Sequence, residues 1–263
     1  MYNTECKISP EQGDEIILAG KGAKPPKGYR QVSTIELRNM YGTWLSPNNL
    51  SMPMIQYLSM MLDVVRSVSH YKGVHMSKCP MDNWVFSEII WERKPNVIVE
   101  LGNQAGGSTM MLRDMLFNSD VKNPKYVIGV DISRNQMPSS ARDYPDIRWI
   151  DGDAMTDKVF EQVKSLISPE DRVMIIDDSS HEYEPTLKIL NKYSPLVTRG
   201  QYFVVEDTLF GKCMPFGKER LRAHESVMKF MEGNKEFEID RTREKWFITL
   251  HPEGYLLRTK SGG

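Results

Sequence analysis

Five short apolar segments between residues 97 and 207 each end on acidic residues. They are rich in β-branched residues and apolar on both faces, which predicts strands covered by helices on both sides. Helical stretches separate most of them, so we expect a parallel, doubly wound α/β sheet. The carboxyl ends of such strands share one edge, where ligands bind, and the sequence therefore predicts a site lined by acids. The segments are 97–100, 127–131, 147–151, 173–178 and 202–207.

The remaining pattern predicts one catalytic domain with an N-terminal extension. Glycines and prolines break residues 1–30, which are predicted to form an irregular arm. Two runs near the C-terminus, 237–239 and 246–250, are predicted to form a closing hairpin at one edge of the sheet. We expect residues 1–90 to form an arm with a helical extension, and residues 91–263 to form the catalytic domain. The predicted helices are 52–70, a helix that Asp82 caps and that runs through 84–90 before Pro95, 107–118, 157–167, 183–193 and 219–232.

Composition narrows the class of protein. The 263 residues are 40% hydrophobic, enough for a sizeable core, and 34 basic residues balance 35 acidic ones. This balance gives no reason to expect nucleic acid or a membrane surface as a partner. Neither a membrane span nor a signal-peptide pattern is recognisable, and the three cysteines are isolated rather than spaced for a disulfide or zinc. The expectation is a cytoplasmic protein with reduced thiols.

A glycine-containing loop, residues 100–108, follows the first predicted strand and opens a helix. Gly102 permits a tight turn, and Gly106 and its neighbour would let a ligand approach the backbone. Gln104 stands where the dinucleotide fingerprint has its second glycine, and Glu100 at the loop mouth disfavours a pyrophosphate. Many strand-to-helix turns contain two glycines, so a purely structural loop is the alternative.

Acids at the ends of three successive strands together indicate one ligand. Glu100 suits an amine, Asp131 can accept hydrogen bonds from both ribose hydroxyls, and Asp153 can accept the exocyclic amine of adenine. Together they predict S-adenosylmethionine. Ser108 is either a contact to the methionine carboxylate or a helix N-terminal residue bonded to backbone.

A second acidic set ends the fourth and fifth strands. If those strands are neighbours, Asp178, Glu206 and Asp207 meet within a few ångströms, where each pair repels by roughly 4 kcal/mol at an effective dielectric of 20. A hard divalent cation relieves this repulsion, and oxygen ligands favour Mg²⁺, Mn²⁺ or Ca²⁺. The alternative is that an acid caps the following helix. Asp177 points the other way in strand geometry, so it either supports the metal ligands or lies near the amine of the cofactor.

His181 lies three residues beyond Asp178. From there an imidazole can reach a hydroxyl at the metal and take its proton, so His181 is the predicted general base. The other four histidines are predicted to be solvated or structural.

At these residues the chain resembles class I S-adenosylmethionine-dependent, metal-dependent O-methyltransferases. The loop is similar to the first motif of the catechol O-methyltransferases, and the acid spacing is similar to their metal triad, whose third member is an amide. A closer resemblance is to the family of cephalosporin hydroxylase-like proteins, rhamnosyl O-methyltransferases and mycinamicin-type macrolide-sugar O-methyltransferases. The stretches that carry it are 78–84, 176–181 and 205–207.

The resemblance implies a Rossmann-like methyltransferase fold over roughly residues 75–250. It makes Asp178, Glu206 and Asp207 ligands of Mg²⁺ or Mn²⁺ and His181 the base, where the catechol enzymes have lysine. It also implies a hydroxylated natural product, a sugar or glycoside, as the small-molecule substrate, and a homo-oligomer.

Two rival functions are an Fe(II) hydroxylase and a cofactor-binding partner of another enzyme. The first usually needs two histidines and a carboxylate, and only His181 is near. Nothing in the sequence excludes the second, although a full acid set with a base argues against it. The segment 208–217 is expected to be either a substrate lid or a long surface loop.

Overall fold

The computed structural model describes residues 16–19, 29–32, 54–209 and 222–259. The chain divides into two compact units, residues 1–68 and residues 69–263. In the first, β1 (Ile16–Ala19) pairs in parallel with β2 (Tyr29–Val32), and α3 (Met54–Val68) lies within the predicted helix 52–70. The irregular arm predicted for residues 1–30 is therefore wrong at β1 and at the start of β2. The rest of that arm lies outside the described residues.

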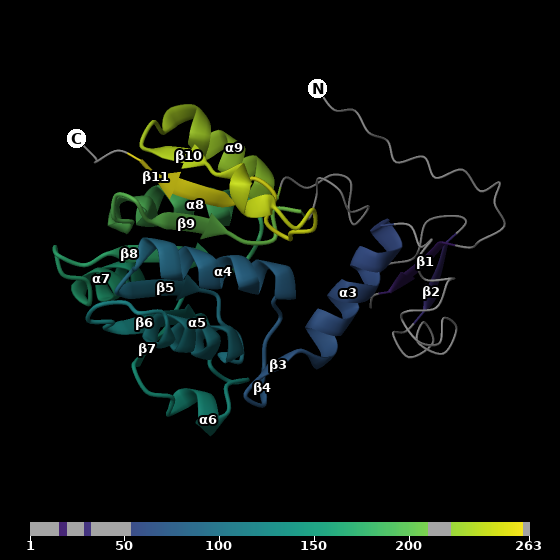
Figure 1. Ribbon diagram of the computed structural model, residues 1–263, viewed down its shortest axis with the longest axis horizontal. Coiled ribbons are helices and arrows are strands. Elements are labelled where there is room, and N and C mark those ends of the chain that lie inside the picture. The colour runs from purple at the N-terminus through teal and green to yellow at the C-terminus, as the bar shows by residue number, and fades with distance from the viewer. Residues whose placement is uncertain (1–15, 20–28, 33–53, 210–221, 260–263) are drawn as a thin grey trace. The chain divides into compact units, whose positions relative to one another are not determined.

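The second unit is built on a seven-stranded sheet, counted over the described residues (Figure 1). Its order is β10-β11-β9-β8-β5-β6-β7, and β5 to β9 are all parallel. β11 runs antiparallel to both of its neighbours. The predicted doubly wound sheet is confirmed. The strands are β5 (Val97–Leu101), β6 (Tyr126–Asp131), β7 (Ile147–Asp151), β8 (Val173–Asp177), β9 (Tyr202–Val205), β10 (Phe237–Ile239) and β11 (Tyr255–Arg258).

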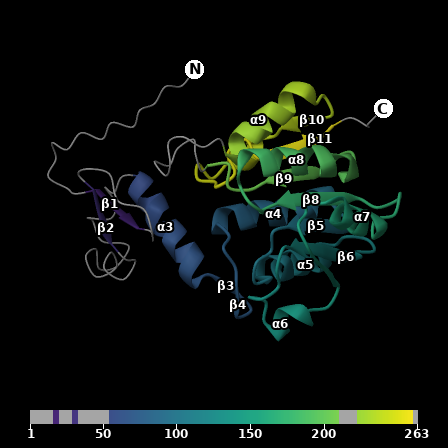
Figure 2. The same cartoon turned by 180° about the vertical axis from the view of Figure 1, so that it is seen from behind.

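Helices cover both faces of this sheet, because alternate strand residues are apolar on each side. Ile98 and Ile176 pack with α4 and α5 on one face (Figure 1). Val99 and Ile175 pack with α7, α8 and α9 on the other (Figure 2). A small hairpin of β3 and β4 precedes α4. The elements are β3 (His70–Tyr71), β4 (Val74–His75), α4 (Pro80–Arg93), α5 (Gly107–Asn118), α6 (Ser139–Arg142), α7 (Asp157–Ser165), α8 (Tyr183–Tyr193), η2 (Ser194–Leu196), α9 (Ala223–Gly233) and η3 (Arg241–Glu244).

Two local predictions are wrong. Asp82 does not cap its helix, because α4 begins earlier, after Cys79 and with Pro80 in its first turn. Buried Asp82 instead accepts hydrogen bonds from the Leu250 N–H and the Tyr255 hydroxyl.

The boundary predicted between residues 90 and 91 falls within α4, and the division into an extension and a methyltransferase domain stays a prediction.

The predicted second strand of the closing hairpin, 246–250, is also not a strand. Phe247 is 97% exposed and has a left-handed backbone, with φ 62°, which breaks an extended segment. The partner of β10 is β11, a few residues later. Gly254 lets this strand start close to β9, since a Cβ there would lie 2.2 Å from the Val205 carbonyl oxygen.

The strand order reverses between β5 and β8, which are parallel neighbours. From β5 the chain moves outward to β6, and from β8 it moves outward in the opposite direction to β9. Ligands of open α/β sheets bind at the carboxyl ends of the strands where the order reverses. The topology therefore places the candidate site at the ends of β5 and β8.

Asp114 of α5 holds the β3–β4 hairpin against the unit. It accepts hydrogen bonds from the Tyr71 hydroxyl at 2.7 Å, the Lys72 Nζ at 2.6 Å and the Tyr144 hydroxyl at 2.8 Å. Burial alone would raise the pKa of Asp114, but these donors outweigh it and lower the pKa from 3.8 to about 2. A lowered pKa means that the carboxylate stabilises the folded state above its unfolded pKa, and that this stabilisation disappears as the pH falls towards 2.

We expect Asp114→Asn to lower the free energy of unfolding at pH 7 by roughly 2 kcal/mol, the equivalent of the pKa shift. The difference from wild type should shrink as the pH falls from about 4 towards 2. Urea unfolding followed by circular dichroism at pH 7, 5 and 3.5 measures it. The exposed Asp143→Asn is the matched control, and an Asp114→Asn loss that is equal at every pH would contradict the assignment.

Candidate active site

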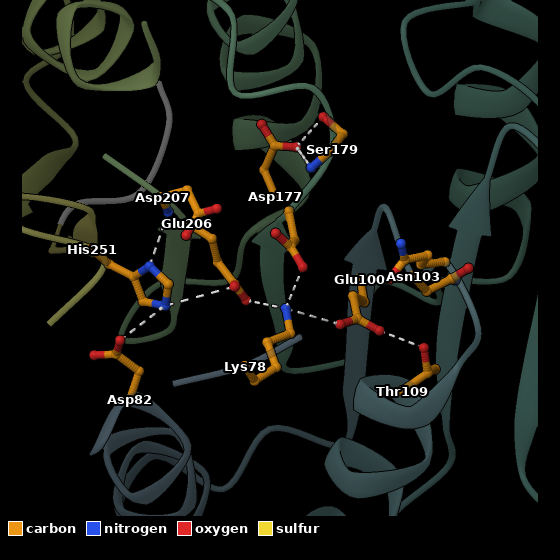
Figure 3. Close-up of polar contacts among 12 residues, drawn as sticks. Lys78, Asp82, Glu100, Asn103, Thr109, Asp177, Ser179, Glu206, Asp207 and His251 are labelled. Atoms are coloured by element: carbon orange, nitrogen blue, oxygen red, sulfur yellow. Dashed lines mark hydrogen bonds and ion pairs between the residues drawn. The ribbon is translucent and has the colours of Figure 1, made fainter. Parts of the chain in front are cut away.

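Acids from three neighbouring strands meet at the reversal point. We call Glu100, Asp178, Glu206 and Asp207 the acidic cluster; they stand at the end of β5 or directly after β8 and β9. Figure 3 shows the side chains of Glu100 and Glu206 turned towards Lys78, which lies between them. The predicted convergence of strand-end acids is therefore present in the fold.

Lys78 supplies the positive charge in this cluster. It lies between β4 and α4, is 3% exposed, and contacts carboxylates from all three strands. Its Nζ lies 2.5 Å from Glu206 Oε1, 2.7 Å from Asp178 Oδ2 and 3.3 Å from Glu100 Oε1. Burial opposes its charge, but these three acids raise the pKa of Lys78 well above its ordinary value. Lys78 is therefore a buried ammonium.

Glu206 faces the protein rather than the open side of the cluster. It is 2% exposed, and its Oε2 lies 3.7 Å from the Nε2 of buried His251. Burial, followed by repulsion from Asp178, raises the pKa of Glu206 well above its usual range, although Lys78 opposes this. Glu206 and Asp207 point to different neighbours despite being adjacent in the chain.

Asp178, His181 and Asp207 form the open side. One donor atom of each lies within 4.8 Å of the others, and no other such group of three metal-binding side chains occurs among the described residues. His181 Nε2 is 3.6 Å from Asp178 Oδ1 and 3.6 Å from Asp207 Oδ2. The three side chains are 20%, 26% and 20% exposed, so a ligand can reach them. Burial, opposed by His181 and reinforced by Asp178, raises the pKa of Asp207.

Two members of this group have a strained backbone. His181 has φ 55° and Asp207 has φ 58°, both in the left-handed region that non-glycine residues rarely adopt. Neighbours hold each turn: the Ala223 N–H donates to the His181 carbonyl, and the Asp207 N–H donates to His251 Nδ1 at 3.0 Å. Such strain is typical of functional sites, where the surrounding structure maintains it.

The glycine loop joins the acidic cluster through its backbone. Gly102 has φ 85°, and a Cβ on it would lie 2.2 Å from the Asp178 carbonyl oxygen. A Cβ on Gly106 would lie 3.0 Å from the Trp149 ring. Both glycines thus allow close approach of protein, and their predicted contact with a cofactor stays a prediction.

Glu100 and Ser108 stand at the two ends of this loop, in β5 and α5. Glu100 is fully buried and accepts a short hydrogen bond from the Thr109 hydroxyl, and Ser108 also interacts with it. Burial raises the pKa of Glu100, and Lys78 opposes that shift. In this structure the Glu100 carboxylate is therefore directed at Lys78 and Thr109.

Asp131 holds the exposed part of the loop. Its Oδ2 accepts from the N–H groups of Asn103 at 2.9 Å and Gln104 at 2.7 Å. Gln104 is exposed and left-handed, with φ 48°. The buried Asn103 amide, by contrast, has no hydrogen-bond partner for either its nitrogen or its oxygen. Asn103 was not among the residues predicted for the site.

The remaining predicted residues, Asp153 and Asp177, are not members of the open group. Asp153 Oδ1 accepts from the Met155 N–H at 2.8 Å, in a turn after β7. Asp177 is buried, and its Oδ1 accepts from the Ser179 hydroxyl at 2.6 Å. Burial raises the pKa of Asp177 to about 6, although Ser179 and His181 oppose the shift.

Comparison with known proteins identifies the family. The model of the family described as rhamnosyl O-methyltransferase/CmcI matches residues 63–259, most of the chain. The chain belongs to this family. This membership agrees with the resemblance found in residues 78–84, 176–181 and 205–207. It supports S-adenosylmethionine-dependent O-methyl transfer as the general activity.

Relatives within the rhamnosyl O-methyltransferase/CmcI family cover most of the chain. A rhamnosyl O-methyltransferase of Mycobacterium leprae (strain TN) is 30% identical over 199 residues, 74% of this chain and 85% of that protein. One of Mycobacterium tuberculosis (strain ATCC 25618 / H37Rv) is 28% identical over 204 residues, 74% of this chain and 80% of that protein.

Solved structures of the family agree in fold. "cmcI-D160 Mg-SAM" has a TM-score of 0.59 at 24% identity, and "CmcI-N160 apo-structure" has 0.57 at 25%; each comparison covers 74% of this chain and 78% of the other. The Rossmann-like methyltransferase fold is confirmed. None of the described helices is both long enough and apolar enough to cross a membrane.

Two buried residues beside the acidic cluster, His251 and Lys78, were not among the residues predicted for the site. His251 was predicted to be solvated or structural, and it has a structural role: it is buried between Asp82 and Glu206 and accepts a hydrogen bond from the Asp207 N–H. Lys78 opens one of the stretches that carry the family resemblance, but no partner was assigned to it. The signal for Lys78 was its place directly before a helix-starting Cys-Pro pair in that stretch.

Proposed function

We propose that this protein transfers the methyl group of S-adenosylmethionine to a hydroxyl of a sugar-containing natural product, in a reaction that depends on Mg²⁺ or Mn²⁺. The observation that carries the proposal is the open group of Asp178, His181 and Asp207, which lies at the sheet's reversal point beside the glycine loop in a member of this family. Two carboxylates and an imidazole there face a common point.

The cofactor half of the proposal rests on the loop and the acids beside it. Gly102, Gln104, Gly106 and Ser108 would line the methionine portion, with Asp131 on the ribose and Asp153 on the adenine. Exposed Gln104 is favourable for this role, as is partly exposed Asp131, which already orders the loop. Glu100 and Asp177 are the proposed acids near the ammonium of the cofactor.

The metal half is supported by the donor set and by charge. Asp178 and Asp207 offer hard oxygen donors at the open group, and Glu206 is the proposed third ligand. Lys78 compensates only part of the charge of the acidic cluster, which leaves an excess of negative charge for a cation. A bound divalent cation would lower the pKa of an acceptor hydroxyl and orient it.

His181 is the proposed general base. Its Nε2 lies between two carboxylates on the open side, where it can take the proton of an acceptor hydroxyl. Proton removal typically contributes a factor of roughly 10²–10⁴, whereas alignment of the reacting atoms contributes ~7–11 kcal/mol. Positioning by the acids and the loop therefore accounts for most of the proposed catalysis.

Among the rival functions, an Fe(II) hydroxylase is disfavoured because the open group holds one histidine, not two. A homo-oligomer that acts on small molecules is part of the proposal.

The predicted lid at 208–217 lies mostly outside the described residues. Its first two residues are buried, and Thr208 Oγ1 donates to the Pro252 carbonyl at 2.7 Å.

Methyl transfer tests the proposed function directly. The full chain is incubated with methyl-labelled S-adenosylmethionine, Mg²⁺ and a panel of rhamnosides, macrolide glycosides and catechols. We expect label on a sugar hydroxyl, and calorimetry should detect S-adenosylhomocysteine binding. Labelling of catechols alone would overturn the substrate class. Binding of a nicotinamide dinucleotide in preference to S-adenosylhomocysteine would overturn the cofactor.

A further inference from the structure

Lys78 binds carboxylate oxygens of residues that are proposed to be metal ligands. Its ammonium contacts one oxygen of Asp178, the Oδ2, while the Oδ1 of the same carboxylate lies 3.6 Å from His181 Nε2 in the open group. Figure 3 shows the Lys78 ammonium between Glu206 and Glu100. The ammonium also takes the Oε1 of Glu206. Lys78 and an ion in the open group would therefore share Asp178 and compete for Glu206.

The third partner of Lys78 gives the ammonium another place to reside. Glu100 lies on β5, on the far side of Lys78 from Glu206 on β9, because β8 separates these two strands in the sheet. Its Oε1 is 3.3 Å from the Lys78 Nζ and has no hydrogen-bond partner. A small shift of the ammonium towards Glu100 would release Glu206 while the lysine remains paired.

We propose that Lys78 is a positioning residue that acts as the counter-cation of the acidic cluster and competes with the divalent cation for Asp178 and Glu206. The inference rests on the proposed function, since it concerns the metal site of that reaction. In the metal-free protein Lys78 holds the carboxylates of three strands together, and metal binding displaces it towards Glu100. Lys78 thereby sets the affinity of the site for its ion.

Mn²⁺ binding to the full chain, without cofactor, tests this competition. Electron paramagnetic resonance measures free Mn²⁺ during titration of the wild type, Lys78→Gln and Lys78→Arg. We expect Lys78→Gln to bind Mn²⁺ more tightly by about tenfold or more, because the competing charge is gone. Lys78→Arg retains the charge and should stay close to wild type. Lys72→Gln, which removes a lysine outside the acidic cluster, is the matched control.

A second comparison tests the same inference if Lys78→Gln fails to fold, because it removes one positive and one negative charge together. The double variant Lys78→Gln, Glu100→Gln should bind Mn²⁺ more tightly than Glu100→Gln alone. Unchanged or weaker Mn²⁺ binding in the variants that remove the charge at position 78 (Lys78→Gln alone, and with Glu100→Gln) overturns the competition while leaving the proposed function standing. If the wild type binds no Mn²⁺, both this inference and the proposed metal dependence are wrong.

Discussion

Replacing His181 by alanine is expected to lower methyl-transfer turnover by roughly 10²–10⁴-fold, the usual contribution of a general base. The structure adds a sharper requirement, because the His181 Nε2 lies 3.6 Å from both Asp178 and Asp207 and belongs to the group of metal-binding side chains. A base is dispensable for metal binding, whereas a ligand is not. His181→Ala should therefore keep its affinity for Mn²⁺ and for S-adenosylhomocysteine.

Single-turnover rates and Mn²⁺ titration of the same preparation separate these roles. His70→Ala, a histidine of β3 outside the acidic cluster, is the matched control and should retain full turnover. Loss of Mn²⁺ binding together with turnover would make His181 a ligand rather than the base. Near wild-type turnover would leave it with a structural role only.

Removal of divalent metal is expected to abolish methyl transfer, and added Mg²⁺ or Mn²⁺ should restore it. Asp207→Asn should behave like the metal-free protein, with turnover lower by about 10²-fold or more, since charge stabilisation by a metal contributes several kcal/mol. Asparagine also adopts the left-handed backbone that residue 207 requires, so the turn is preserved. Turnover with excess chelator, after elemental analysis for residual metal, measures the effect.

Asp151→Asn is the control for this experiment, because Asp151 also ends a strand of the sheet but pairs with Arg134. Glu206→Gln tests the proposed third ligand, whose carboxylate faces Lys78 in this structure. If Asp207→Asn and the chelated wild type both keep full activity, the metal requirement is wrong. If only Glu206→Gln keeps it, the ion is held without Glu206.

The elements that could be predicted are those whose signal is local. Helices 107–118 and 183–193 were predicted with the bounds of α5 and α8, because a glycine turn or a strand end precedes each apolar pattern. The predicted strand at 246–250 failed because its aromatic residues suit a strand, yet Phe247 is exposed and left-handed. The Leu250 N–H at the end of that segment donates to Asp82, 168 residues away, a contact that no local periodicity predicts.

In the candidate site, too, only the residues with a local signal could be predicted from the sequence. Acids at strand ends could be located from the strand pattern, since parallel strands bring their carboxyl ends together. The residues that contact those acids could not be predicted. Lys78 is 128 residues from Glu206 in the chain, and His251 is 44 residues from Asp207. Only the packing of α4 on the sheet and the pairing of β11 with β9 bring these residues together. Positive backbone angles at His181 and Asp207 likewise depend on neighbours from α9 and from the segment before β11.

The contact between Gly102 and Asp178 has a consequence for anyone who exchanges parts between members of this family. The backbone of the loop after β5 and the backbone of the loop after β8 approach so closely that only a residue without a side chain fits between them. The two loops therefore depend on each other structurally, although more than seventy residues separate them in the chain. A chimera that swaps the first loop for a relative's sequence with a bulkier residue at 102 would push the second loop aside. Segments 100–108 and 177–181 should be transplanted together.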